Sequence, residues 1–154
     1  MTRWLLKSEP NEFSIDDLKQ KTIEPWDGIR NYQARNFIRQ MQPGELAFFY
    51  HSSCKEVGII GIVEIAGTYY EDPLAVDKNS PYFDKKALDS NPWSAIDVRF
   101  SSKFSSVLTL ATLKKLALKD QRLADFALLK KGNRLSVMPV SDDQWQCIME
   151  NIAP

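Results

Sequence analysis

The segment 26–37, with the sequence WDGIRNYQARNF, combines the residue types best able to bind a ligand. Trp26 offers a flat aromatic face beside a glycine turn. Arg30 stands just before a predicted helix, whose N-cap position falls on Asn31. An aromatic face, free backbone N–H groups at a helix start and an arginine together suit planar groups, anions and phosphates. The alternative is a helix with a solvated basic face and Trp26 in the core, and these residues by themselves favour that alternative.

Hydrophobic periodicity predicts the helix that follows this turn, and Pro43-Gly44 ends it. At about 100° per residue, the outer face carries Tyr32, Arg35 and Arg39. The core-facing residues of the helix are Ala34, Phe37, Ile38 and Met41. We therefore expect a helix with one buried face and one basic stripe.

Length and charge indicate one globular domain over residues 1–154. The chain is 44% hydrophobic and 26% charged, with 20 basic and 20 acidic side chains and a net charge of zero. Any contact with nucleic acid therefore has to come from a local patch. Cys54 and Cys147 form no Cys-x-x-Cys pair and are typical of free thiols in a reducing compartment. Without an apolar run of about 18 residues or a signal peptide, the sequence predicts a cytoplasmic protein that contacts no membrane.

Few residues are suited to catalysis. His51 is the only histidine and has no neighbours at ligand spacing, so we expect no metal and no cofactor. No Gly-x-Ser-x-Gly elbow, glycine-rich phosphate loop or dinucleotide fingerprint is present. Trp4 and Trp145 lie in periodic elements and are predicted core residues. Trp26 and Trp93 lie beside polar turn residues and could stack on a planar base.

The remaining pattern predicts an α+β fold around a small barrel-like sheet. Predicted strands cover residues 3–7, 45–50, 57–66, 92–100, 107–110 and 134–140. Gly58 and Gly61 indicate a bulge or a close backbone approach.

Further helices are predicted after the N-caps Ser14 and Ser141 and over residues 113–118 and 123–131. Predicted core residues of the first and last helical regions are Ile15, Leu18 and Ile23, and Trp145, Ile148, Met149 and Ile152. Residues 68–91 have no clear period and read as a long loop, of the kind that often carries function.

Three motifs follow one another along the chain. They are Trp4-Leu5-Leu6-Lys7-Ser8-Glu9-Pro10, then residues 26–36, then Phe48-Phe49-Tyr50-His51-Ser52, with Gly58-Ile59-Ile60-Gly61 and Asn91-Pro92-Trp93 beyond them. In this order they resemble the EVE domain family, the family of thymocyte nuclear protein. The resemblance implies a PUA-like fold, a small, mostly antiparallel β-barrel flanked by helices and related to YTH domains. It also implies binding of a modified nucleobase in DNA or RNA.

The same resemblance implies a set of ligand-binding residues. Those that match the family's motifs are Ser8, Glu9, Trp26, Arg30, Asn31, Tyr32, Tyr50, His51, Ser52, Arg134, Leu135 and Ser136, with Trp93 assigned from looser surroundings. A base held there needs stacking faces and partners for its polar edge. Arg30, Arg35 and Arg39 could meet the flanking phosphates. An ion pair with Asp27 is an equally weighted alternative for Arg30.

These observations predict a monomeric, non-catalytic reader, meaning a protein that binds a modified base in DNA or RNA and leaves it unchanged. The alternative is a hydrolase, because related ASCH domains include enzymes that act on modified nucleosides. Lys7, Glu9 and Glu45 or Tyr50 could supply acid–base groups if they converge. A protein-interaction module is a third interpretation, favoured if Trp26 is buried.

Overall fold

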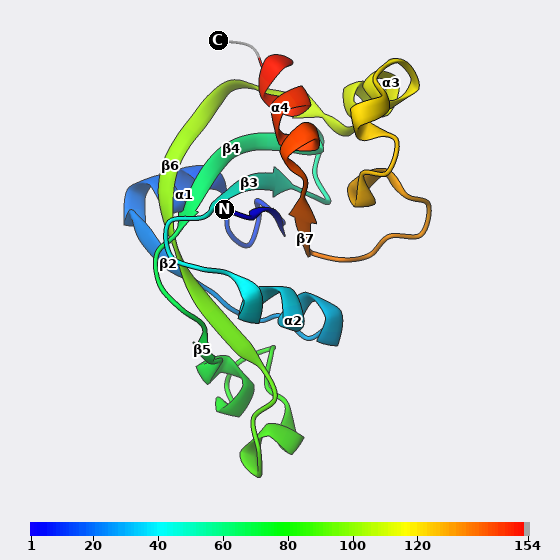
Figure 1. The fold of residues 1–154 in the computed structure, drawn as a ribbon. Coiled ribbons are helices and arrows are strands. Elements are labelled where there is room, and N and C mark those ends of the chain that lie inside the picture. Colours follow the sequence, from blue (N-terminus) through cyan, green and yellow to red (C-terminus); the bar gives the residue numbers. More distant parts are fainter. Residues whose placement is uncertain (153–154) are drawn as a thin grey trace.

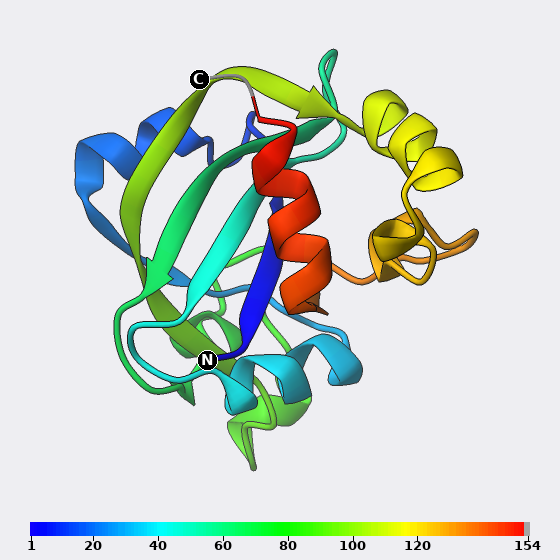
Figure 2. The same cartoon turned by 45° about the horizontal axis from the view of Figure 1, so that its top comes forward.

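A curved sheet forms the centre of the molecule (Figures 1 and 2). The computed structural model describes residues 1–152, and within them seven strands pair in the order β2-β6-β4-β3-β1-β7, with β5 beside β6. The strands are β1 (Arg3–Ser8), β2 (Ile23–Trp26), β3 (Leu46–His51), β4 (Gly58–Ile65), β5 (Tyr70–Glu71), β6 (Ser94–Thr109) and β7 (Val137–Val140). β1 and β3 are parallel, and the other pairs are antiparallel. The predicted α+β class and mostly antiparallel sheet are confirmed, with β2 and β7 at the two ends of the series.

Helices cover both faces of this sheet. The α-helices are α1 (Ile15–Lys21), α2 (Tyr32–Gln40), α3 (Leu110–Lys119) and α4 (Asp142–Glu150). The short 3-10 helices are η1 (Pro73–Val76), η2 (Lys85–Leu88), η3 (Gln121–Leu123) and η4 (Ala127–Leu129). α1 and α2 pack against one core, and α3 and α4 pack against another. None of the helices formed by residues 1–152 has the length and apolar character needed to cross a membrane.

Neighbouring residues of β3 belong to these two separate cores, because side chains alternate across a strand. Phe49 packs on the α1 and α2 side with Trp4 and Trp26. Phe48 packs on the other side and stacks on Trp145, with ring centroids 3.8 Å apart. The prediction that Trp4 and Trp145 are core residues is confirmed.

β4 and β6 approach closely at two glycines. A Cβ at Gly58 would lie 2.2 Å from the carbonyl oxygen of Leu108, and one at Gly61 would lie 2.4 Å from that of Ser102. The pairing register also shifts between Ile59 and Gly61. The predicted bulge and close backbone approach are therefore both present.

The predicted N-caps are confirmed. Ser14 and Ser141 each begin a helix with a complete capping box. The Asn31 side chain accepts a hydrogen bond from the amide of Ala34 at 2.9 Å, which places the start of α2 directly after the turn at Gly28. Local side-chain chemistry thus positions the helix that follows Trp26.

Two predictions around the sheet edges were wrong. Residues 23–26 form β2, an edge strand that pairs only with β6, and Ile23 is 42% exposed instead of facing the core. Most of the two segments predicted as separate strands, 92–100 and 107–110, belongs to a single strand of 16 residues, β6. β6 pairs with β4 on both sides of the intervening residues, with a shift in register between Lys103 and Leu108.

Predictions in the C-terminal third were also partly wrong. No α-helix forms over residues 123–131: η3 ends at Leu123, and η4 covers only Ala127–Leu129. The Asn133 side chain bonds to the Ala127 carbonyl and the Leu135 amide, which holds the chain in a loop until β7 begins. On α4, Met149 is 40% exposed instead of facing the core.

Residues 68–93 form a projecting lobe at the bottom of Figure 1. The lobe contains β5, η1 and η2, and Trp93 packs with Ala75 and Ala87 in a small core of its own. Asp72 is fully buried at its base, where it accepts hydrogen bonds from Gly28 and Leu74. The lobe is therefore fastened to the turn that follows Trp26.

Candidate nucleobase-binding pocket

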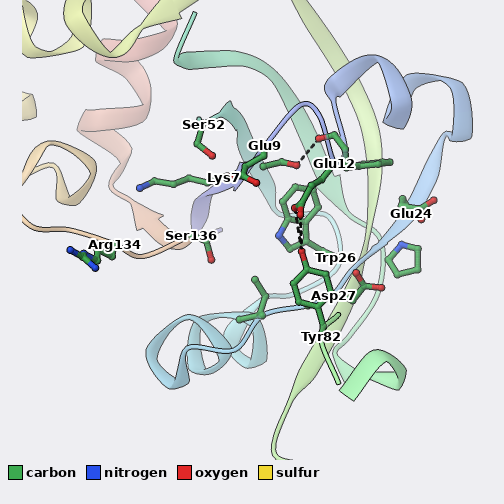
Figure 3. Close-up of a pocket in the computed structure, with 15 residues that line it drawn as sticks. Lys7, Glu9, Glu12, Glu24, Trp26, Asp27, Ser52, Tyr82, Arg134 and Ser136 are labelled. Atoms are coloured by element: carbon green, nitrogen blue, oxygen red, sulfur yellow. Dashed lines mark hydrogen bonds between the residues drawn. The ribbon is translucent and has the colours of Figure 1, made fainter. Parts of the chain in front are cut away.

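A pocket of about 620 Å³ opens beside Trp26 (Figure 3). It is formed where the ends of β1, β2 and β3 meet the chain leading into β7 and the tip of the lobe. Its lining residues are Lys7, Ser8, Glu9, Glu12, Phe13, Glu24, Pro25, Trp26, Asp27, Gly28, Ile29, Ser52, Tyr82, Arg134 and Ser136. Six of the sequence-predicted residues therefore line one pocket: Ser8, Glu9, Trp26, Ser52, Arg134 and Ser136.

Trp26 forms the aromatic part of the wall. Its ring meets Phe49 edge-on at 5.5 Å and Phe13 at 6.5 Å, and only 7% of the residue is exposed. Within residues 1–152 its indole Nε1–H has no hydrogen-bond acceptor. The nitrogen is nevertheless accessible, because the buried unpaired side-chain atoms do not include it. Trp26 is thus buried in the core, which is the condition named above for a protein-interaction module, but it also lines the pocket, to which it presents its indole N–H.

Backbone hydrogen bonds hold the end of β1 beside Trp26. The amide of Lys7 donates to the Ser136 carbonyl at 2.8 Å, and the amide of Ser52 donates to the Ser8 carbonyl at 2.9 Å. The Ser8 hydroxyl donates to the Phe13 carbonyl at 2.5 Å. These bonds bring together three pocket segments that are far apart in the sequence.

The pocket has a cationic side and an acidic side. In Figure 3, Lys7 and Arg134 lie on one side of Trp26, and Glu24 and Asp27 lie on the other. Burial lowers the pKa of Lys7. Burial, together with the neighbouring carboxylates of Asp72 and Glu24, raises the pKa of Asp27 to about 6. The lining thus offers both donors and acceptors to a polar ligand edge.

Nine of the 15 lining residues were not in the predicted ligand-binding set, and the polar ones among them include Glu12, Glu24, Asp27 and Tyr82. Tyr82 comes from the lobe, whose irregular sequence gave no indication of where it would fold. One local signal was available, because Gly28 adopts φ +75° and a Cβ there would lie 3.2 Å from the Tyr82 ring. A glycine two residues after a tryptophan could have indicated a close neighbour.

Arg30 serves mainly to attach the lobe. Its Nη1 lies 2.9 Å from the buried carboxylate of Asp72, so the ion pair is with Asp72 and not with Asp27. Its Nε donates to the Tyr82 carbonyl at 2.9 Å. Among the described residues Arg30 Nη2 is buried without a partner. The guanidinium is therefore turned toward the lobe and does not line the pocket.

Trp93 and Tyr32 lie together outside the pocket. Their rings stack with centroids 4.7 Å apart, and Trp93 Nε1 donates to Asp84 at 2.8 Å. Arg35 lies over the exposed Tyr32 ring at 4.8 Å. The structure therefore does not place Trp93 opposite Trp26, and Asn31 is used as the α2 cap.

The two arginines predicted to contact phosphate lie on the outer face of α2. Arg35 Nη1 and Arg39 Nη2 both donate to the Pro92 carbonyl, at 3.2 and 2.9 Å. Arg39 Nε donates to Ser94, and its guanidinium lies over the exposed Tyr69 ring at 5.7 Å. These contacts fix the guanidinium groups but leave the charged surface of α2 accessible.

Tyr50, His51 and Leu135, which were predicted to bind the ligand, do not line the pocket. Burial raises the pKa of Tyr50 to about 12, and the Lys7 ammonium lies 5.8 Å from its ring centroid. His51 Nε2 accepts a hydrogen bond from the Ile15 amide at 3.2 Å, and burial lowers its pKa. Leu135 packs against both cores.

In the described part of the chain, no group of three or more His, Cys, Asp or Glu side chains is placed to hold a metal ion.

Comparison with known proteins agrees with this architecture. The EVE domain family model matches residues 2–151. Human thymocyte nuclear protein 1 is 39% identical over 164 residues, which cover 96% of this chain and 72% of that protein. A crystal structure from Pseudomonas syringae superposes with a TM-score of 0.91 at 52% identity, covering 96% of this chain and 97% of that one.

Two further structures bear on the site. Human THYN1, solved in complex with 5-methylcytosine-containing DNA, superposes with a TM-score of 0.92 at 38% identity over 100% of both chains. An ASCH protein of Zymomonas mobilis superposes with a TM-score of only 0.56 at 11% identity, and this likeness shows a shared fold alone. The resemblance found in the three sequence motifs is confirmed along almost the whole chain, which belongs to the EVE domain family.

Proposed function

We propose that this protein binds a modified base of the 5-methylcytosine type in nucleic acid and leaves it chemically unchanged. The observation that carries the proposal is the pocket beside Trp26, with its indole N–H directed to the ligand space. It occurs in a chain that superposes along its full length on human THYN1, which was solved with 5-methylcytosine-containing DNA.

The size and chemistry of the pocket support this proposal. Its volume of about 620 Å³ lies within the range of about 300–1,000 Å³ that is typical of small-ligand sites. Stacking of a base on an aromatic ring contributes about 1–3 kcal/mol. A methyl group adds only about 0.8 kcal/mol of apolar burial. Strong preference for the modified base would therefore require the unmodified base to leave a polar group unpaired.

The nucleic-acid backbone would be met by a small number of cations. Lys7 and Arg134 lie at the pocket, and Arg35 and Arg39 lie on the outer face of α2. Bases and phosphates are common to DNA and RNA, so we extend the proposal to both. We also propose a monomer that acts in the cytoplasm, in keeping with its two free cysteines.

The hydrolase alternative would need acid–base groups around the ligand. Lys7 and Glu9 do line the pocket. Glu45 is buried elsewhere, where it accepts hydrogen bonds from Trp4 Nε1 at 2.9 Å and from the Thr2 amide at 3.0 Å. Glu45 is therefore remote from the other two groups. Tyr50 lies beside Lys7 but does not line the pocket, and burial raises its pKa to about 12, so we propose binding without catalysis.

A direct test measures affinity for single-stranded oligonucleotides that carry cytosine or 5-methylcytosine at one position. We expect tighter binding of the 5-methylcytosine strand, and mass spectrometry after long incubation should show that it is intact. Trp26→Phe keeps an aromatic core ring but removes the indole donor, so it should weaken binding at least about fivefold. Equal affinity for both strands would contradict the proposal. Turnover that disappears in Glu9→Gln would favour the hydrolase.

A further inference from the structure

Tyr82 is the residue of the lobe that reaches back to the pocket, and its backbone is firmly held. Its carbonyl accepts a hydrogen bond from Arg30 Nε at 2.9 Å, and its amide donates to the Ser80 hydroxyl at 3.0 Å. Arg30 is in turn anchored by its ion pair with buried Asp72. Because these contacts fix the backbone, any rearrangement of Tyr82 has to be made by its side chain.

The Tyr82 ring lies against the turn that follows Trp26. A Cβ at Gly28 would lie 3.2 Å from three of the ring carbons, so the backbone of the turn and one side of the ring are in close contact. Both residues line the pocket together with Trp26. Tyr82 thus joins Trp26 and Phe13 as an aromatic side chain of the pocket, whereas Trp93 lies outside it.

The Tyr82 hydroxyl donates to both carboxylate oxygens of Glu12, at 3.3 and 3.2 Å. Glu12 belongs to the loop between β1 and α1, so this Tyr82–Glu12 bridge joins the lobe to the opposite rim of the pocket (Figure 3). Burial and the Glu12 carboxylate raise the pKa of Tyr82, which keeps its hydroxyl a donor. The bond is long, shared between two acceptors and exposed, so a ligand can displace it readily.

We propose that the Tyr82–Glu12 bridge closes the pocket in the free protein and that both residues contact the base once it enters. This inference rests on the proposed function. The entering base breaks the hydrogen bond between the two side chains. The Tyr82 ring then meets the face of the base, and the freed Glu12 carboxylate accepts a hydrogen bond from an exocyclic amine.

The freed carboxylate would make Glu12 a specificity-determining residue. Carboxylates accept from the N4 amine of cytosine, whereas thymine presents a carbonyl oxygen at that position. Thymine carries the same 5-methyl group as 5-methylcytosine, so a pocket that selected only the methyl would accept both. Repulsion between the Glu12 carboxylate and the thymine carbonyl would reject thymine.

The test compares affinities for matched single strands with 5-methylcytosine or thymine at one position. Tyr82→Phe keeps the ring and removes the bridge, so it should bind 5-methylcytosine as tightly as the wild type or up to about tenfold tighter. Tyr82→Leu should bind about tenfold more weakly, because the stacking face is lost. Glu12→Gln can also donate a hydrogen bond, so the preference for 5-methylcytosine over thymine should fall about tenfold.

Tyr70→Leu is the matched control, since Tyr70 is an exposed tyrosine of the lobe that neither lines the pocket nor contacts the arginines of α2, and it should bind like the wild type. Wild-type affinity in Tyr82→Leu, or an unchanged base preference in Glu12→Gln, would overturn the inference and leave the proposed function standing. A wild-type protein that binds none of the strands would overturn both. If Tyr82→Leu does not fold, the binding results of Tyr82→Phe and Glu12→Gln test the inference instead. Both variants nearly retain the size of the original side chain.

Discussion

Asp27 illustrates how single residues of the pocket are tuned by neighbours from other elements. It follows Trp26 directly, and Glu24 and buried Asp72 face it while Arg30 partly offsets their charge. The charge of Asp27 in turn contributes to the raised pKa values of Tyr70 and Tyr82. The ionised form of Asp27 is therefore disfavoured in the folded protein.

This environment gives a pH dependence of stability. The pKa of Asp27 rises from 3.8 to about 6 on folding, so the folded state holds the proton more tightly between these values and the free energy of unfolding falls as pH rises through them. Asp27→Asn should remove this loss and be more stable than the wild type at pH 7. A pKa shift of this size corresponds to at most about 3 kcal/mol in the free energy of unfolding. Because Asp27 is partly solvated, we expect the variant to gain only about 1–2 kcal/mol.

Urea unfolding of both proteins from pH 4 to pH 8 would measure the difference. Asp89→Asn, at an exposed position of the lobe, is the control and should follow the wild type at every pH. A difference between Asp27→Asn and the wild type that stays constant with pH would show that the carboxyl does not titrate in this range.

At the scale of elements, the β4–β6 pair depends on the missing side chain of Gly58. A Cβ there would lie 2.2 Å from a backbone oxygen of the partner strand, and neither strand can yield without loss of pairing. Gly58→Ala should therefore reduce the free energy of unfolding by about 2–3 kcal/mol or more. Gly67→Ala is the matched control, because no atom lies within 4 Å of its Cβ position, and it should change stability by less than about 1 kcal/mol. Thermal melts of the two variants would show the contrast, and equal melting points would contradict it.

Helices α1, α2 and α4 were predictable because their N-terminal signals are local. Ser14, Asn31 and Ser141 are caps whose partners lie three residues away. β2 was missed because its exposed Ile23 and its Pro25 give no alternating pattern, and its pairing with β6 depends on residues about 70 positions along the chain. Strand partners at such separations leave little trace in a local window.

The pocket could be predicted only in part for the same reason. Trp26 and its turn were recognisable as a short motif, and Ser8, Ser52 and Ser136 followed from the resemblance. Tyr82 was missed because its contacts with Gly28 and Glu12 join a segment without periodicity to residues more than 50 positions away. Resemblance placed Trp93 near the ligand, whereas the structure uses it as the core of the lobe.

At the scale of the whole molecule, the balance of charge limits how strongly phosphates can contribute to binding. The net charge is zero, and the cations near the pocket and on α2 are few. Two to four phosphate contacts would give a slope of log affinity against log salt of about −1.5 to −3 for single strands. Titrations with a 5-methylcytosine oligonucleotide at several salt concentrations would measure this slope. A slope near about −8 would reveal a large basic surface that this chain does not show.

The position of β1 between β3 and β7 has a consequence for how the protein is made. Of the seven strands in residues 1–152, β1 is synthesised first and its partner β7 is synthesised last. The hydrogen bond from Lys7 to Ser136, which closes one side of the pocket, joins these same two segments. Nascent chains and truncated products that end before β7 therefore lack a complete pocket. Only a chain that has been synthesised through β7 can bind the ligand in this way.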